Sequence, residues 1–328
     1  MNETTMIEAA ASSSPKIGEL YPPLIISQLS AGYAGNTILN GLDLSVGTGE
    51  IFGLLGSNGS GKTTLIRTIC GRIHIRSGTV ELAGKKIDRG GKNNAVGLVP
   101  QEIALYPFLS VRENLELFGQ LSGLDRKDIS AASSNALEST GLTERADDIV
   151  ETLSGGYKRR ANIAAAILHQ PSIILFDEPT VGVDIDARHG LHDVIRKLKR
   201  SGAAIILTTH DMSQAEALCD RVGFLRDGIL SPVGTPEELV KEKFGNKREV
   251  VIAVRSTPSE RQSARLSKAG FHSAKNGLEW SALFKMRPND EGKIAQTIHK
   301  AGIDVHEIRF RQPGLDSLFM SLVREDAL

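Results

Sequence analysis

Short apolar runs separated by helical segments make up the middle of the chain. Two of these runs, at residues 172–176 and 203–209, are continuous rather than alternating. Continuous runs of this length suit strands that are buried on both faces of a parallel sheet. A helical segment at about 186–201 lies between them and completes a β-α-β unit. The pattern therefore predicts an α/β domain, and the apolar run at 51–55 predicts another strand.

Alternating patterns elsewhere predict antiparallel strands. Residues 24–29 and 42–46 alternate and are separated by a Gly-Asn turn. Residues 78–84 are expected to form a hairpin strand, and residues 95–100 a second strand that ends at its proline. A later hairpin over 222–230 turns at an Asp-Gly pair. We therefore expect an antiparallel β flank beside the α/β domain.

Helical periodicity dominates from Val111 to about residue 169. Its apolar residues fall on two helical faces, one made of Val111, Leu115, Phe118 and Leu121, the other of Ile163, Ala166 and Ile167. We interpret this segment as a helical insert, spanning about 102–168, within the α/β domain. After the last hairpin, Thr235 is expected to cap a short helix from Pro236 to about Phe244.

The pattern changes near residues 245–248, where we place a domain boundary. The segments beyond it are predicted to be a strand at 250–254, a helix at 259–269, a hairpin over 271–286, a helix at 291–301, a strand at 305–311 and a helix at 315–324. That order is close to the β-α-β-β-α-β arrangement of ferredoxin-like domains. We therefore predict a flexible N-terminal tail over 1–23, the α/β domain over 24–244, and a small α+β regulatory or interaction domain over 245–328.

Composition limits the classes of function. A chain of 328 residues is long enough for two domains. Its 39 acidic and 39 basic residues cancel, so binding to nucleic acid by bulk charge is not expected. Cys70 and Cys219 lack metal-site spacing and are interpreted as reduced, packed thiols of a cytosolic protein. No apolar run reaches the length of a membrane span, and the first residues do not read as a signal peptide. We expect any membrane role to run through another chain.

The stretch after the 51–55 strand has the spacing G-x-x-x-x-G-K-T and leads into a helix. Glycines let the backbone approach a ligand so that successive N–H groups point at an anion, and the helix N-terminus adds a partial positive charge. Lys62 can reach the β- and γ-phosphates of a nucleotide, and the Thr63 hydroxyl can bind Mg²⁺. A tight turn without a ligand is the alternative. The predicted phosphate-binding residues are Gly56, Ser57, Asn58, Gly59, Ser60, Gly61, Lys62, Thr63 and Thr64.

Ionisable residues follow both strands of the β-α-β unit. Asp177 and Glu178 come directly after one strand, and His210 follows the other. Open α/β sheets bind ligands at the carboxyl ends of their strands. Asp177 can hold Mg²⁺, Glu178 can polarise a water aimed at the γ-phosphate, and His210 can donate a hydrogen bond to a phosphate oxygen. A solvated pair of carboxylates and a loop histidine are the alternative interpretations.

Two further features are ambiguous from the residues alone. Tyr33 could stack on a purine ring or be an exposed surface aromatic. The stretch at 153–157 begins a helix for which Ser154 is a suitable N-cap, yet three cations follow at 158–160. Because the helix dipole disfavours positive charge near a helix N-terminus, either a bound polyphosphate or a solvated basic turn would account for them.

These features occur in a fixed order: the phosphate loop, Gln101, the Leu-Ser-Gly-Gly stretch, the two carboxylates, the segment at 181–184 and the histidine. In this order they closely resemble the ATP-binding subunit of ABC transporters, over roughly residues 24–235. The resemblance implies a P-loop ATPase fold of the ABC type, with ATP and Mg²⁺ as cofactors and a separate transmembrane permease as partner. Tyr157 and the Val-Gly-Val-Asp segment depart from the family's usual glutamine and Ser-Gly-Leu-Asp, which leaves details of a dimer interface open.

The resemblance also implies roles for single residues. Tyr33 matches the aromatic residue that stacks on adenine, and Gln101 matches the glutamine that senses Mg²⁺ and contacts the permease. Asp177 matches the Mg²⁺ carboxylate, Glu178 the catalytic base and His210 the switch histidine.

In this family the Leu-Ser-Gly-Gly stretch completes the site of the opposite subunit. The resemblance therefore implies that Ser154, Gly155 and Gly156 contact the nucleotide of a second copy or of a similar subunit. The phosphate that would account for the basic turn then belongs to this neighbour. Arg160 falls where the family has an arginine. With a single phosphate loop and a single such stretch, the chain is expected to form a dimer.

Within the family, the stretch at 106–115 and a C-terminal domain ending in 312–319 resemble the ATPases of bacterial ABC-2 type exporters of drugs, polysaccharides or lipids. We expect a cytoplasmic exporter subunit, peripheral at the inner face of the cell membrane through its permease. One alternative is a soluble ABC-type ATPase that acts on ribosomes or DNA. The other is a nucleotide-dependent regulator without turnover, against which Glu178 argues because a pure binder has no use for a base.

Overall fold

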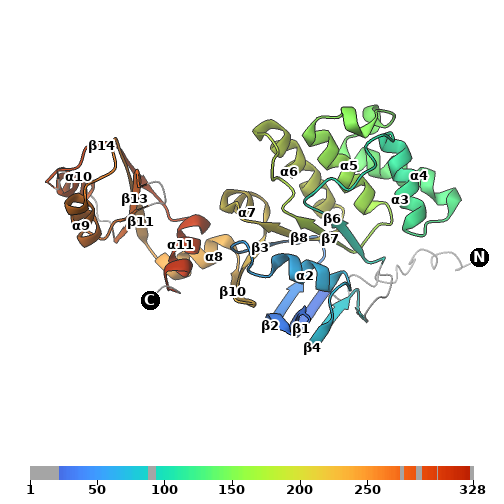
Figure 1. Ribbon diagram of the computed structural model, residues 1–328, viewed down its shortest axis with the longest axis horizontal. Coiled ribbons are helices and arrows are strands. Elements are labelled where there is room, and N and C mark those ends of the chain that lie inside the picture. Colours follow the sequence, from blue (N-terminus) through green and yellow to red (C-terminus); the bar gives the residue numbers. More distant parts are fainter. Residues whose placement is uncertain (1–21, 88–93, 274–276, 286–289, 301, 326–328) are drawn as a thin grey trace, which may run out of the picture. The chain divides into compact units, whose positions relative to one another are not determined.

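A computed structural model describes residues 22–87, 94–273, 277–285, 290–300 and 302–325 (Figure 1). The chain divides into two compact units, the first made of Met1–Asp211 and Leu218–Ser231, the second of Met212–Ala217 and Pro232–Leu328. The predicted tail over 1–23 lies almost wholly outside the described residues. The domain boundary near residue 245 stays a prediction. Among the described residues, no helix is both long and apolar enough to cross a bilayer.

A six-stranded sheet forms the centre of the first unit. Its strands lie in the order β10 (Ile229–Gly234), β9 (Arg221–Arg226), β3 (Ile51–Leu55), β8 (Ala204–Thr209), β7 (Ile173–Asp177) and β6 (Val96–Val99). Pairing is parallel from β9 through β6, and every residue of β3 and β8 is buried. The continuous apolar runs therefore form buried parallel strands, as predicted. The hairpin between β9 and β10 turns at Asp227 and Gly228, which both have positive φ.

Two helices follow the carboxyl ends of strands of this sheet. Helix α2 (Lys62–Ile69) comes after β3 and buries Leu65, Ile66 and Ile69. Helix α6 (Ile185–Arg200) connects β7 to β8 and begins at Asp184, whose side chain accepts a hydrogen bond from the Ala187 N–H at 2.8 Å. The β-α-β unit that the apolar pattern predicted is thus confirmed.

An antiparallel sheet lies below α2 in Figure 1, in the order β2 (Asn36–Val46), β1 (Leu24–Tyr33), β4 (Ile75–Leu82) and β5 (Lys85–Lys86). The β1–β2 hairpin is longer than the alternating segments predicted, because register shifts between Ile26 and Gly32 interrupt the alternation of side chains. Tyr33 pairs with Asn36 across a turn at Ala34-Gly35, so it ends a strand and does not lie in a loop. The predicted antiparallel flank is confirmed.

The helical insert consists of α3 (Val111–Leu121), α4 (Arg126–Thr140), the short 3₁₀ segments η1 (Thr143–Arg145) and η2 (Val150–Thr152), and α5 (Gly155–Ile167). A separate apolar core joins these helices and includes Val111, Leu115, Leu137, Leu142, Ala161 and Leu168. Of the apolar residues predicted to share one face of this helix, Val111 and Leu115 are buried, whereas Leu121, the last residue of α3, is 60% exposed.

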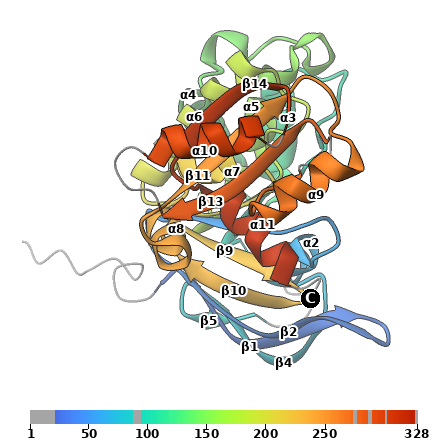
Figure 2. The ribbon, with the colours of Figure 1, turned by 90° about the vertical axis from the view of Figure 1, so that its left-hand side faces the viewer.

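The second unit contains α7 (Met212–Leu218), α8 (Pro236–Phe244) and a four-stranded sheet in the order β12 (His272–Ser273), β13 (Glu279–Lys285), β11 (Lys247–Val254) and β14 (Val305–Arg311). Helices α9 (Glu260–Lys268) and α10 (Asp290–Lys300) lie on one face of this sheet, as Figures 1 and 2 show. The chain ends in α11 (Leu315–Glu325). The predicted β-α-β-β-α-β order and the Thr235 cap of α8 are both found.

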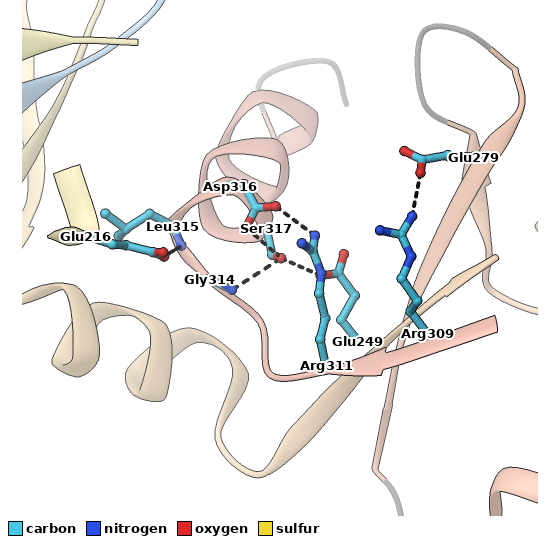
Figure 3. A network of polar contacts seen from close by, with 9 residues as sticks. All are labelled: Glu216, Glu249, Glu279, Arg309, Arg311, Gly314, Leu315, Asp316 and Ser317. Carbon is cyan, nitrogen blue, oxygen red and sulfur yellow. Dashed lines mark hydrogen bonds and ion pairs between the residues drawn. The ribbon is translucent and has the colours of Figure 1, made fainter. Parts of the chain in front are cut away.

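Charged side chains hold α11 within the second unit (Figure 3). Glu249 on β11 is 5% exposed, and its carboxylate accepts hydrogen bonds from Arg311 Nε at 2.9 Å and Ser317 Oγ at 2.8 Å. The Glu216 carboxylate of α7 accepts a hydrogen bond from the Leu315 N–H at 2.6 Å. The first N–H groups of a helix lack partners within the helix, so this carboxylate caps α11 from another segment of the chain.

Candidate nucleotide site

The G-x-x-x-x-G-K-T stretch joins the end of β3 to the start of α2. Gly61 is the N-cap of α2 with φ of 109°, and Gly59 has φ of 85°, conformations that favour glycine. The Lys62 side chain folds back over the loop, where its ammonium donates to the carbonyl oxygens of Gly56 at 2.8 Å and Ser57 at 3.0 Å. The loop is therefore a compact concave turn with its lysine already in place across it.

The loop has unfilled capacity to bind an anion. Ser60 Oγ is buried and has no hydrogen-bond partner among the described residues. The first turn of α2 carries no acidic residue and its N-cap makes no side-chain hydrogen bond, so the N–H groups of that turn are available. Burial lowers the pKa of Lys62, and the nearby charges of Glu178 and Asp177 oppose this shift. A nucleotide polyphosphate fits these groups, since it would accept the free hydrogen bonds and offset the buried ammonium.

The two carboxylates lie where β7 ends beside β8. Asp177 is paired in register with Thr208, which is completely buried. The Thr208 hydroxyl donates to Asp177 Oδ1 at 2.9 Å and accepts from the Glu178 N–H at 3.0 Å. One hydroxyl thus orients both acidic residues. Thr208 was not predicted as a site residue, because its only signal in the sequence is a hydroxyl near the end of a strand, and the pairing with Asp177 depends on strand register.

Glu178 and His210 meet at the ends of the two strands. His210 Nδ1 lies 3.0 Å from Glu178 Oε2, and it donates to this oxygen in the ring tautomer that carries its hydrogen on Nδ1. Glu178 has φ of 48°, an uncommon backbone conformation for a residue with a side chain, and such conformations cluster at functional sites. The Glu178 side chain is 13% exposed and that of His210 58%. The structure therefore brings together Asp177, Glu178 and His210.

Tyr33 is fixed to the helix that follows the phosphate loop. Arg67 of α2 donates from Nη1 to the Tyr33 hydroxyl at 3.0 Å, and Arg76 donates from Nη2 to the Tyr33 carbonyl at 2.6 Å. Tyr33 is nevertheless 46% exposed. An anchored aromatic ring with this much free surface is able to stack on a planar ligand.

Gln101 lies just after β6, the strand next to β7 in the sheet. It is exposed, and its carbonyl oxygen accepts a hydrogen bond from Arg159 Nη1. Because parallel strands present their carboxyl ends at one edge, Gln101, after β6, and Asp177, the last residue of β7, lie at the same edge of the sheet.

The Leu-Ser-Gly-Gly stretch forms the start of α5. Ser154 is the N-cap, as predicted, but its exposed hydroxyl makes no capping hydrogen bond. Gly156 is buried, and a Cβ there would lie 2.6 Å from the Ala187 Cβ on α6. Among the described residues, no hydrogen bond joins 154–156 to residues 56–64.

The three cations after this stretch have partners within the chain, which sequence reasoning did not foresee. Lys158 Nζ donates to the Glu151 carbonyl at 2.9 Å. Arg159 donates to the carbonyl oxygens of Gln101 and Val181. The Arg160 guanidinium lies 5.6 Å from the centroid of the Tyr157 ring, within the range of a cation–π contact. Carbonyl oxygens and an aromatic face therefore account for these charges without a phosphate.

Comparisons with known proteins agree with this geometry. The family model "ABC transporter" matches residues 39–181. The linearmycin resistance ATP-binding protein of Bacillus subtilis (strain 168) is 35% identical over 90% of this chain and 96% of its own length. The Nod factor export ATP-binding protein I of Ralstonia nicotianae is 40% identical over 70% of this chain and 72% of its own length.

A solved structure gives the same result for the fold. The cbiO1 protein of Clostridium perfringens, described as part of the ABC transporter complex cbiONQ, aligns with a TM-score of 0.63 and 28% identity. The alignment covers 68% of this chain and 92% of that one. The chain therefore belongs to the ABC transporter family, as an ATP-binding subunit that hydrolyses ATP.

Proposed function

We propose that this chain uses Mg²⁺ and ATP to power export of a drug, polysaccharide or lipid through a separate membrane permease. The observation that supports ATP hydrolysis at this site is the group of side chains at the ends of β7 and β8. There Thr208 orients Asp177, and His210 contacts Glu178 at 3.0 Å.

The proposed chemistry assigns one task to each part of the site. Lys62 and the N–H groups of residues 57–64 hold the phosphates, and the Tyr33 ring stacks on adenine. Thr63, Asp177 and Gln101 would hold Mg²⁺, which neutralises charge on the β- and γ-phosphates when bound.

Glu178 accepts the proton of the attacking water, and His210 fixes that carboxylate from one side. A neutral His210 that donates from Nδ1 keeps Nε2 as an acceptor, whereas the protonated ring can donate to a phosphate oxygen as well. Positioning and charge stabilisation would therefore supply most of the catalysis.

A second copy, or a similar subunit, would complete each site. The Ser154 hydroxyl has no capping partner, and the first N–H groups of α5 are free to meet an anion. Since no hydrogen bond of the described residues joins this segment to its own phosphate loop, we assign Ser154, Gly155 and Gly156 to the nucleotide held by the partner.

Two observations support a permease partner and export. Large exposed apolar side chains lie a few residues after Gln101, where Tyr106 is 52% and Phe108 76% exposed, and they suit contact with another protein. The names of the two relatives refer to linearmycin resistance and to Nod factor export. We place the chain at the inner face of the cell membrane, held there by the permease.

Hydrolysis by Glu178→Gln tests the catalytic assignment. Glutamine keeps the shape of the side chain but accepts no proton, so the variant should bind ATP with Mg²⁺ normally and release almost no phosphate. His210→Gln serves as a second variant, with a smaller loss expected because it acts through Glu178. Near-normal phosphate release by the Glu178 variant would contradict the assignment. Co-purification with a membrane protein encoded beside this chain tests the permease separately.

A further inference from the structure

Arg159 joins the loop that contains Gln101 to the loop that contains Glu178, and both residues belong to the proposed nucleotide site. It lies on α5, one turn after the helix begins, and its guanidinium forks between two carbonyl oxygens. Nη1 donates to the Gln101 carbonyl, and Nη2 donates to the Val181 carbonyl at 3.0 Å. These carbonyls lie in the loop after β6 and in the loop after β7, and these two strands are neighbours in the sheet.

The loop after β7 carries Glu178. Its turn is closed by a hydrogen bond from the Val181 N–H to the Glu178 carbonyl at 3.3 Å, so the carbonyl that Arg159 holds belongs to the same turn as the proposed base. A shift of that carbonyl therefore moves the backbone of Glu178, whose φ of 48° leaves it little freedom to compensate.

The loop after β6 is held to α5 by a second side chain. Asn162, one turn beyond Arg159, is 3% exposed and accepts a hydrogen bond from the Ala104 N–H at 3.2 Å. It also donates to the carbonyl oxygens of Pro100 at 3.4 Å and Glu102 at 3.3 Å. Arg159 and Asn162 thus fasten residues 100–104, including Gln101, to the helix that begins with the Leu-Ser-Gly-Gly stretch.

The two contacts of Arg159 are suited to holding the loop after β6 and the loop after β7 at a fixed distance from each other. Burial lowers the pKa of the guanidinium, which nevertheless stays charged at neutral pH. A partly buried charge must keep its hydrogen-bond partners, because losing them leaves the charge without compensation. The guanidinium is planar and rigid, so two carbonyls bound to its two ends are held at a set separation.

We propose that Arg159 is a positioning residue for ATP hydrolysis. Its two hydrogen bonds make the start of α5, the Gln101 loop and the Glu178 loop move as one unit. The proposal rests on the roles proposed above for Gln101, Glu178 and Ser154. When the start of α5 meets the partner's nucleotide, Arg159 transmits that displacement to the base and to the Gln101 loop. Contact with the neighbour's ATP would then align hydrolysis at the chain's own site.

Replacing Arg159 tests the proposal in the full chain. Arg159→Met removes both donors while keeping an extended side chain, and Arg159→Lys keeps the charge but not the fork. Lys197→Met is the matched control, because Lys197 Nζ also donates to a main-chain carbonyl, that of Glu138 at 3.0 Å, between helices away from the site. The measurements are kcat and KM for MgATP, and hydrogen exchange of the backbone amides in both loops.

We expect kcat of Arg159→Met to fall about tenfold to a hundredfold, with KM for ATP changed less than about twofold, since the residue does not contact ATP. Exchange should rise at Ala104 in one loop and at Val181 and Val183 in the other. Arg159→Lys should recover part of kcat, and Lys197→Met should match the unmodified chain in all of these measurements.

An unchanged kcat, or faster exchange in only one loop, would overturn the proposal. A fall in kcat accompanied by a general rise in exchange across β3 and β8 would show a folding defect. The proposal then fails unless Arg159→Lys lowers kcat and raises exchange in the two loops alone. The exchange measurement does not depend on Glu178 being the base. Normal hydrolysis by Glu178→Gln would therefore defeat the proposed function and leave the Arg159 link standing.

Discussion

Thr208→Val is the substitution that tests most sharply how the site orients its carboxylates. Valine has nearly the shape of threonine, so the packing around this completely buried side chain is kept. What disappears is the hydroxyl that donates to Asp177 Oδ1 at 2.9 Å and accepts from the Glu178 N–H at 3.0 Å. The Glu178 N–H keeps its bond to the Thr208 carbonyl at 3.2 Å, so Asp177 is the residue that loses most.

The expected size follows from the kind of bond that is lost. A hydrogen bond to an ionised carboxylate contributes roughly 1.5–3 kcal/mol, and we take the lower half of that range because Asp177 is only half-buried. A loss of about 1.5 kcal/mol in the placement of a metal ligand corresponds to slightly more than a tenfold loss of metal affinity. We therefore expect the Mg²⁺ concentration for half-maximal ATPase activity to rise about tenfold.

Thr209→Val is the control for this experiment. Thr209 is the next residue of β8, is 3% exposed, and accepts a hydrogen bond from the Asp211 N–H at 3.0 Å. Its side chain points to the opposite face of the strand, so it does not reach Asp177. Both variants should lose similar stability in urea unfolding, but only Thr208→Val should shift the Mg²⁺ dependence. An equal shift in both variants, or none in Thr208→Val, would show that the Thr208 hydroxyl does not orient Asp177 for Mg²⁺.

Three further predictions concern other parts of the chain. Lys62→Ala should weaken ATP binding by at least about tenfold, because the ammonium that spans the phosphate loop is lost, and an unchanged affinity in a nucleotide titration would count against the loop assignment. Burial raises the pKa of Cys70 to about 11 and that of Cys219 to about 12, so both remain neutral thiols until the pH approaches those values. At pH 8 they should react with iodoacetamide roughly a hundredfold or more slowly than an exposed thiol of pKa ~8.5, and alkylation at the normal rate in the folded protein would contradict this. Ser317→Ala removes one of the two donors to buried Glu249 and should destabilise the chain by about 1 kcal/mol in urea unfolding, with ATPase activity unchanged.

The sequence was sufficient for features that depend on neighbouring residues. Continuous apolar runs identified the buried parallel strands, and the residues directly after them gave Asp177, Glu178 and His210. Local capping signals were informative too: Thr235 caps α8, and Ser154 is the N-cap residue of α5 although its hydroxyl makes no capping hydrogen bond. In each case the physical signal lies within a few positions along the chain.

Features that depend on strand register or on distant partners were not predictable. Thr208 becomes important only because β7 and β8 align it with Asp177. The bulges of β1 hide its length, since they interrupt the alternation on which the prediction relied. Arg159 looked unfavourable near a helix N-terminus because its carbonyl partners lie 58 and 22 positions away in the sequence.

We propose that the phosphate loop is half of a site and that Ser154 of another copy supplies the other half. The most direct test is the mass of the Glu178→Gln chain in solution by light scattering, with and without ATP. We predict 35.3 kDa without nucleotide and about twice that mass with ATP. Adding Ser154→Phe to this variant should leave ATP binding intact and keep the chain monomeric. A monomer with bound ATP in the single variant, or a dimer that persists in the double variant, would contradict the account.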